Sequence, residues 1–152
     1  MSSKTLLLIL LSGLCSFQVL AVKEADLEQL MRTKACVGCD LREAELQFTD
    51  LKNADLRGAD LSYANLEAAW MSDADLTGAK LISVNLASAD LRGANLTEAE
   101  LDSANLVGTR FEGADLTRAI LLYSRIVYTD IENAKLCQTF VDSPGIPRND
   151  DC

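Results

Sequence analysis

The sequence contains no histidine, only two prolines and one tryptophan, and fewer basic residues (14) than acidic ones (23). Without histidine there is no Ser–His or Cys–His catalytic pair and no histidine ligand for zinc. The acidic excess disfavours binding to nucleic acid and to anionic membranes, and it favours cations or basic partners. Pro144 and Pro147 both fall near the C-terminus, which leaves the rest of the chain free to form backbone hydrogen-bond ladders.

The N-terminus has the pattern of a secretory signal peptide. Lys4 precedes an apolar run from Leu6 to Val22, and Val19 and Ala21 suit the −3 and −1 positions of a cleavage site. We therefore expect residues 1–21 to be removed and the mature chain to be exported and free of the membrane. An uncleaved N-terminal membrane anchor stays open as the alternative, because a run of this length is at the lower end of the roughly 17–25 residues that span a bilayer.

The expected mature chain, residues 22–152, has 13 basic and 23 acidic residues, and so a net charge of −10. It retains four of the five cysteines. An even number of cysteines in an exported protein points to disulfide bonds in an oxidising compartment.

An apolar residue stands at every fifth position from Leu41 to Leu136, 20 times in succession, and 16 of these residues are leucine. The residue two places earlier is alanine in 14 pentads, and the residue one place earlier is Asp or Glu in ten and Asn in four. Five steps would turn an α-helix by roughly 500° and would alternate the faces of a strand. The chain must therefore turn once per pentad, with leucine and alanine pointing inward and the residue between them pointing outward.

The pattern A(D/N)Lxx, which continues from Cys39 to about Gln138, resembles the pentapeptide-repeat family. The resemblance implies an all-β solenoid, a right-handed quadrilateral β-helix of about five 20-residue coils. We assign residues 22–35 to an N-terminal capping helix, residues 36–138 to the β-helix and residues 139–152 to a C-terminal tail. Alanine fills the second inward position because the square is narrow, so Val84 predicts a local distortion.

Both ends of such a stack need a cover. At the N-terminal end, Leu27, Leu30 and Met31 have the i, i+3, i+4 spacing of an amphipathic helix, which should lay its apolar stripe on the first coil. At the other end, five apolar residues occupy outward positions of the last coil: Ile120, Leu122, Tyr123, Val127 and Tyr128. Either the tail folds back over them, or they form a docking or dimer surface.

The same geometry assigns the cysteines. Cys36 and Cys39 lie at one end of the stack, and Cys137 and Cys152 lie at the other, about 24 Å away at about 4.8 Å per coil. A disulfide requires Cα atoms within about 7 Å, so the pairs are 36–39 and 137–152. The CVGC motif is interpreted first as a structural bridge and second as a redox-labile one. CVGCDL and a tail that ends in cysteine also resemble exported cyanobacterial and thylakoid-lumen members of the family.

The outward faces carry many acids, for example Asp73 and Asp75, but a column filled with leucine offers no cleft for acid–base chemistry. Trp70 should lie partly exposed in the middle of one face, either as local cover for Met71 or as a binding hot spot. We expect a non-enzymatic structural or protein-interaction module of the periplasm or thylakoid lumen, without cofactor or metal, and a homo-oligomer stays open. Two alternatives are a DNA mimic that inhibits a DNA-binding protein such as gyrase, which the family resemblance implies, and weak cation binding along the acidic column Asp55, Asp75, Asn95 and Asp115.

Overall fold

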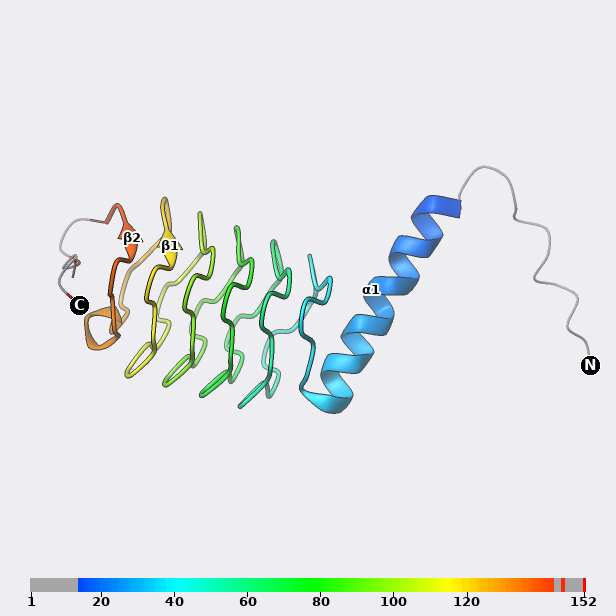
Figure 1. Ribbon diagram of the computed structural model, residues 1–152, viewed down its shortest axis with the longest axis horizontal. Coiled ribbons are helices and arrows are strands. Elements are labelled where there is room, and N and C mark those ends of the chain that lie inside the picture. The colour runs from blue at the N-terminus through cyan, green and yellow to red at the C-terminus, as the bar shows by residue number, and fades with distance from the viewer. Residues whose placement is uncertain (1–13, 144–145, 147–151) are drawn as a thin grey trace, which may run out of the picture.

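The computed structural model describes residues 14–143, 146 and 152, with side chains from residue 23 onward. One α-helix, α1 (Leu14–Thr33), leads into a stack of coils, with the C-terminal segment at the opposite end of the stack (Figure 1). The remaining elements of the described chain are β1 (Ile120–Leu121), the 3-10 helix η1 (Ile131–Asn133) and β2 (Phe140–Val141). Residues 1–13 of the expected signal peptide, and both prolines, lie outside the described residues.

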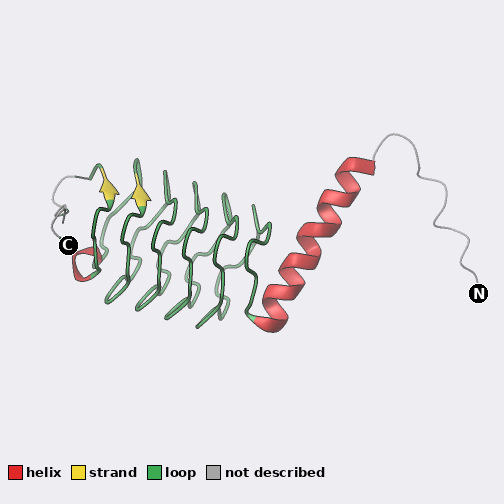
Figure 2. Ribbon diagram, in the orientation of Figure 1, coloured by secondary structure: helices red, strands yellow, loops and turns green. Residues whose placement is uncertain are grey.

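The coils repeat every 20 residues. Parallel bridges join Ala35 to Asp55, Asp55 to Asp75 and Asp75 to Asn95, and three further columns of bridges with the same offset begin at Asp40, Glu45 and Asp50. These four columns are the four sides of the solenoid, which we name the Ala35, Asp40, Glu45 and Asp50 sides. Each side contributes a single bridge residue per coil, so most of the stack is drawn as loop and turn in Figure 2.

A tight turn forms each regular corner. In the pentad of Leu56, for example, the Ala59 N–H donates to the Leu56 carbonyl (3.1 Å), and Gly58, the third residue of the turn, has a φ of +63°. A positive φ at this position is typical of a type II turn. Other corners place Asn53 or Ser83 at the same position with φ near +57° and +55°, at a cost of roughly 1 kcal/mol each. The ladders on both sides of each corner hold these residues in place, so glycine is not required.

The core is one continuous cluster of apolar side chains that runs along the stack. The inward leucines are buried, and the 20-residue register of the bridges places Leu56, Leu76, Leu96 and Leu116 in one column. The predicted distortion at Val84 is wrong. Val84 is fully buried, its turn is closed by a hydrogen bond to the Leu81 carbonyl (3.3 Å), and its ladder bonds are intact. Its neighbours in the column are Ala64 and Ala104, and these small residues leave room for the two extra methyl groups.

The C-terminal half of α1 covers part of the first coil. Leu30 is buried and Leu27 packs against the core, as the sequence predicts, but Met31 is 56% exposed. The helix meets the first coil near its C-terminal end and slopes away from the stack (Figure 1), and its apolar contacts with the core come from Leu27 and Leu30. The helix also begins eight residues before Val22, because residues 14–22 contain neither glycine nor proline.

The last coil departs from the regular pattern. After Asp130 the chain forms η1, and the Asp130 carboxylate, instead of a backbone carbonyl, accepts a hydrogen bond from the Phe111 N–H. The tail then resumes the register, since β2 pairs in parallel with β1 and aligns Phe140 with Ile120. Within the described residues, no helix combines the length and apolarity needed to cross a lipid bilayer.

Candidate interaction surfaces

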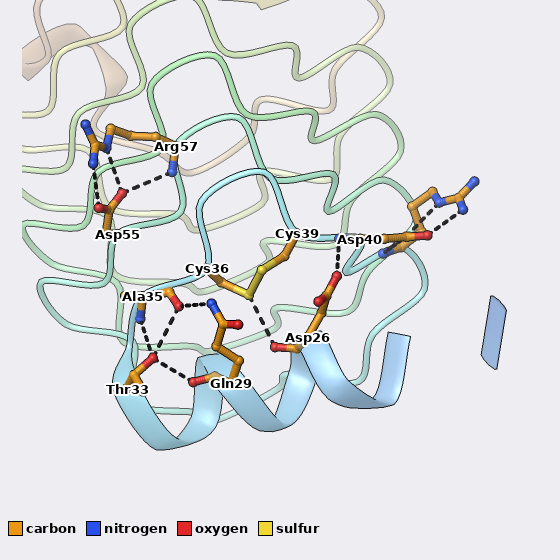
Figure 3. The surroundings of a disulfide bond; sticks show 10 residues. Asp26, Gln29, Thr33, Ala35, Cys36, Cys39, Asp40, Asp55 and Arg57 are labelled. Carbon is orange, nitrogen blue, oxygen red and sulfur yellow. Dashed lines mark hydrogen bonds and ion pairs between the residues drawn. A yellow bond between two sulfur atoms is a disulfide. The ribbon is translucent and has the colours of Figure 1, made fainter. Parts of the chain in front are cut away.

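The Cys36–Cys39 disulfide lies inside the first coil (Figure 3). Its Cα atoms are 5.3 Å apart, and the two residues are 0% and 7% exposed. Cys36 stands five residues before Leu41 and is stacked under Leu56, so it occupies the leucine position of one further pentad. Cys39 occupies the alanine position. The bridge thus replaces a leucine and an alanine as core filling, as the structural interpretation of CVGC predicts. This pentad was not recognised in the sequence because its centre is a cysteine and not a large apolar residue.

Helix α1 satisfies backbone groups that a further coil would otherwise satisfy. The Asp26 carboxylate accepts a hydrogen bond from the Asp40 N–H (2.8 Å), and the Gln29 amide donates to the Ala35 carbonyl (2.8 Å). The Cys36 sulfur, which has no proton in the disulfide, lies 3.2 Å from the Asp26 carbonyl oxygen. The cap therefore closes the Ala35 and Asp40 sides of the first coil.

The second disulfide closes the opposite end. Cys137 and Cys152 have Cα atoms 5.8 Å apart, and Cys137 lies at a corner of the last coil. At the corner that follows Leu121, the Asp142 carboxylate accepts a hydrogen bond from the Tyr123 N–H (3.1 Å). The described part of the tail is thus attached to the last coil through β2, this carboxylate and the disulfide.

The apolar residues predicted at the C-terminal end divide into two groups. Ile120 and Leu122 are half-buried, and Ile120 lies under the tail, where it pairs with Phe140. Val127, Tyr123 and Tyr128 are 39%, 79% and 89% exposed. The described part of the tail, residues 139–143, 146 and 152, therefore covers Ile120 and leaves the two tyrosines exposed.

Three further aromatic side chains are exposed that the sequence analysis did not select. Phe48, Tyr63 and Phe140 are 66%, 64% and 59% exposed. Phe48 and Tyr63 stand two residues after a pentad centre, the same outward position that identified Tyr123 and Tyr128, so the signal was present in the sequence. Trp70 is 51% exposed, and the Lys52 ammonium lies 5.7 Å from the centre of its ring.

The acidic column of the Ala35 side is largely neutralised within the chain. Arg57 pairs with Asp55 (2.7 Å) and reaches Asp75 (3.8 Å), and Lys135 pairs with Asp115 (2.9 Å). The hydrogen bond from Arg57 holds the pKa of Asp55 below its usual range. No group of three or more histidine, cysteine or acidic side chains in the described part of the chain is placed to hold a metal ion.

The Glu45 side carries an asparagine ladder instead of ion pairs. Asn65 donates to Glu45 (3.2 Å), Asn85 donates to Asn65 (3.1 Å) and Asn105 donates to Asn85 (2.9 Å). The column ends at Arg125, which is exposed. Of the four asparagines that stand one place before a pentad centre, three therefore lie on this side, because they are spaced by the 20 residues of one coil.

Comparison with known proteins identifies the repeat. The family model of pentapeptide repeats matches eight copies over residues 39–78, 59–98, 79–118 and 99–138. The chain belongs to the pentapeptide-repeat family. Its members form right-handed quadrilateral β-helices, which agrees with the fold expected from the sequence.

Solved structures of pentapeptide-repeat proteins resemble this chain. One from Nostoc PCC 7120 is 31% identical with a TM-score of 0.58, covering 82% of this chain and 95% of that one. One from the thylakoid lumen of Arabidopsis thaliana is 21% identical with a TM-score of 0.63, covering 70% and 84%. QnrB1, a plasmid-mediated fluoroquinolone resistance protein, is 21% identical with a TM-score of 0.50, covering 72% and 56%. A comparison with curated protein sequences found no match.

Proposed function

We propose that this pentapeptide-repeat protein is a non-enzymatic interaction module of an exported, oxidising compartment, either a periplasm or a thylakoid lumen. The observation that carries the proposal is that a disulfide closes each end of the solenoid. Such bonds persist in exported proteins and are reduced in the cytosol. The pattern of a signal peptide at residues 1–21 supports the same location.

Export is tested by expressing the full chain in a Gram-negative host. We expect the protein in the periplasmic fraction, an N-terminus at Val22 and four oxidised cysteines by mass spectrometry. A chain with an intact N-terminus in the membrane fraction would support the anchored alternative instead. Free thiols in a cytoplasmic protein would contradict the proposal.

We infer that the partner is a protein and that it contacts the exposed tyrosines of the last coil. Aromatic side chains are enriched at binding hot spots, and Tyr123 and Tyr128 combine the highest exposure of the large apolar residues with a rigid scaffold. Affinity capture from the native compartment should recover a partner with the wild-type protein and lose it with Tyr123→Glu/Tyr128→Glu. The melting temperature should stay unchanged, because both side chains lie outside the core.

The matched variant Trp70→Ala removes an exposed aromatic from the Asp50 side and should leave the capture intact. Loss of the partner with Trp70→Ala, and not with the tyrosine pair, would place the binding surface on that side. A large fall in melting temperature for the variant of the tyrosine pair would support the interpretation in which the tail packs over these residues.

DNA mimicry is the second candidate, favoured by the net charge of −10 for residues 22–152. The likeness to QnrB1 shows a shared fold and leaves the function of this chain open. The arginine pairs on the Ala35 side weaken the negative field that a mimic needs. A supercoiling assay with purified gyrase tests this candidate: inhibition at stoichiometric concentration would support it, and no inhibition would exclude it for gyrase.

Weak cation binding along the acidic column is the third candidate. Asp55, Asp75 and Asp115 are already engaged by Arg57 and Lys135, so few carboxylates of this column are free for an ion. Calorimetry with calcium would support this candidate through a saturable heat and would dismiss it through a heat of dilution alone.

A further inference from the structure

The Glu45 side differs from the other three sides in its charge. In the third coil the stretch from Ile82 to Ser88 contains no charged residue, and in the fourth coil Asp102 to Gly108 contains only Asp102. The middle of the side is the ladder of Asn65, Asn85 and Asn105. The charges beside this column, Arg42, Glu43, Glu67 and Asp102, lie away from the third coil, so the middle of the face offers a second copy little repulsion.

The two ends of this column carry opposite and unpaired charges. Glu45 lies at its start and Arg125 at its end, both exposed, and neither takes part in an ion pair within the described residues. Arg42, Arg57 and Arg92, by contrast, each contact a neighbouring aspartate. Four coil spacings of about 4.8 Å separate Glu45 from Arg125, so they cannot pair within one chain.

We propose that the Glu45 side is the interface of a homodimer in which two solenoids pack face to face with antiparallel axes. A two-fold axis beside Asn85 places Glu45 of each copy opposite Arg125 of the other. A parallel arrangement would instead bring Glu45 against Glu45 and Arg125 against Arg125. The sequence of the column, one acid, three amides and one base, is therefore self-complementary in the antiparallel sense only.

The corners that border this side agree with the arrangement. Phe48 lies in the first coil and Tyr128 in the last coil at the same corner, 66% and 89% exposed, so each Phe48 would face the Tyr128 of the other copy. A second copy and the proposed protein partner would therefore compete for Tyr128. Near the axis, Ile82 and Ala87 would each meet their own symmetry mate. The two solenoids share one coil spacing, so their rows of side chains stay in step across the whole interface.

The size of the face predicts a weak dimer. Five coils give a height of about 24 Å, and the five residues of one side span at most about 16 Å. The flat area is therefore roughly 400 Å² per copy, which belongs to the transient class of interfaces. We expect a dissociation constant in the micromolar range or weaker. The inference goes beyond the proposed function, which a monomer would serve equally well.

A charge exchange followed by sedimentation equilibrium tests the proposal. The wild-type chain, residues 22–152, should pass from monomer to dimer as its concentration rises. Glu45→Arg and Arg125→Glu should each weaken the dimer roughly tenfold, and the double variant should restore it. Glu45→Arg also makes the chain less negative, so an effect of net charge alone would strengthen association, the opposite result.

Glu132→Arg is the matched control, since it makes the same charge change at an exposed corner away from this side and should leave the dimer unchanged. Circular dichroism and the melting temperature verify that every variant is folded. A monomer at the highest concentration would overturn the proposal. A monomer–dimer equilibrium that neither single variant alters would also overturn it, and is what an end-to-end dimer through Tyr123 predicts. Failure of the double variant to restore the dimer would overturn it as well.

Discussion

At the scale of single residues, the outward position before each pentad centre stabilises the turn that follows it. The Asp60 carboxylate accepts a hydrogen bond from the Ser62 N–H (3.0 Å), Asp75 accepts one from Thr77 (3.0 Å), and Asn65 accepts one from Glu67 (3.2 Å). Asp and Asn side chains reach the backbone two residues ahead, which explains their frequency here better than solubility does. The same residues then pair with each other or with arginine between coils.

At Asp90 the two roles, accepting a hydrogen bond from the turn and pairing with an arginine, can be tested separately. The hydrogen bond from Arg92 lowers the pKa of Asp90 against the effect of burial, and the Asp90 side chain is only 13% exposed. Asp90→Asn retains an acceptor for the turn but loses the charge, so we expect a loss of about 1 kcal/mol in the free energy of unfolding at pH 7.

The pH dependence of that loss has a definite sign. Because the folded pKa lies below the unfolded value of about 3.9, the contribution of Asp90 is present above that value and is lost as the pH falls through the folded pKa. Urea unfolding should therefore separate wild type from Asp90→Asn at pH 7 and bring them together in strong acid. Asp102→Asn, at a site without an ion pair among the described residues, is the control. A pH-independent difference would contradict this account.

At the scale of elements, α1 acts as a replacement for a coil. Its residue Asp26 takes the place of a backbone carbonyl of a preceding coil, because the Asp26 carboxylate accepts the hydrogen bond of the Asp40 N–H. Asp26→Ala leaves this N–H without a partner, and we expect a loss of about 1–2 kcal/mol.

The loss at Asp26 should be local. Hydrogen exchange should accelerate at Asp40 and its neighbours in the first coil and stay unchanged in the later coils. Glu28→Ala, on an exposed position of the same helix, should change neither the exchange nor the stability. Equal effects of the two variants would show that α1 contributes through helix propensity alone.

The elements also show how far the sequence could predict the structure. Leucine and alanine at fixed positions of the pentad predicted one turn in every five residues, and the resemblance to the pentapeptide-repeat family added the square coil of 20 residues. Cys36 was not recognised as a pentad centre, since the period was followed only through large apolar residues. Nothing in the pentad of Ile131 distinguishes η1 from a regular corner. Met31 was misplaced because helical periodicity defines a stripe but not the angle at which a helix crosses the coil beneath it.

The surface was predicted less well than the core. The columns of outward residues followed from the 20-residue coil, but the partners of each charge did not. Whether Arg57 pairs with Asp55 or extends into solvent depends on side-chain packing between neighbouring coils. The asparagine ladder likewise depends on the orientation of each amide, which a pattern of residue types does not specify.

At the scale of the whole molecule, the solenoid is close to one-dimensional, because each coil contacts only the coils before and after it. The free energy of unfolding is then the sum of one term for each coil and one term for each interface between neighbouring coils. A defect in the middle weakens two such contacts and can divide the stack, whereas a defect in the last coil weakens one.

Leu96 and Leu136 provide a matched comparison, since they occupy the same column in the middle and at the end, 0% and 5% exposed. Leu96→Ala should lower the free energy of unfolding by about 3 kcal/mol, because the lost side chain leaves a cavity that coils on both sides cannot fill. Leu136→Ala should cost less, because the last coil can relax. Its increased hydrogen exchange should be confined to the last coil and to β2, while Leu96→Ala should raise exchange along the whole stack. Equal losses of stability for the two variants would mean that the tail and the Cys137–Cys152 bridge hold the last coil as rigidly as a further coil would.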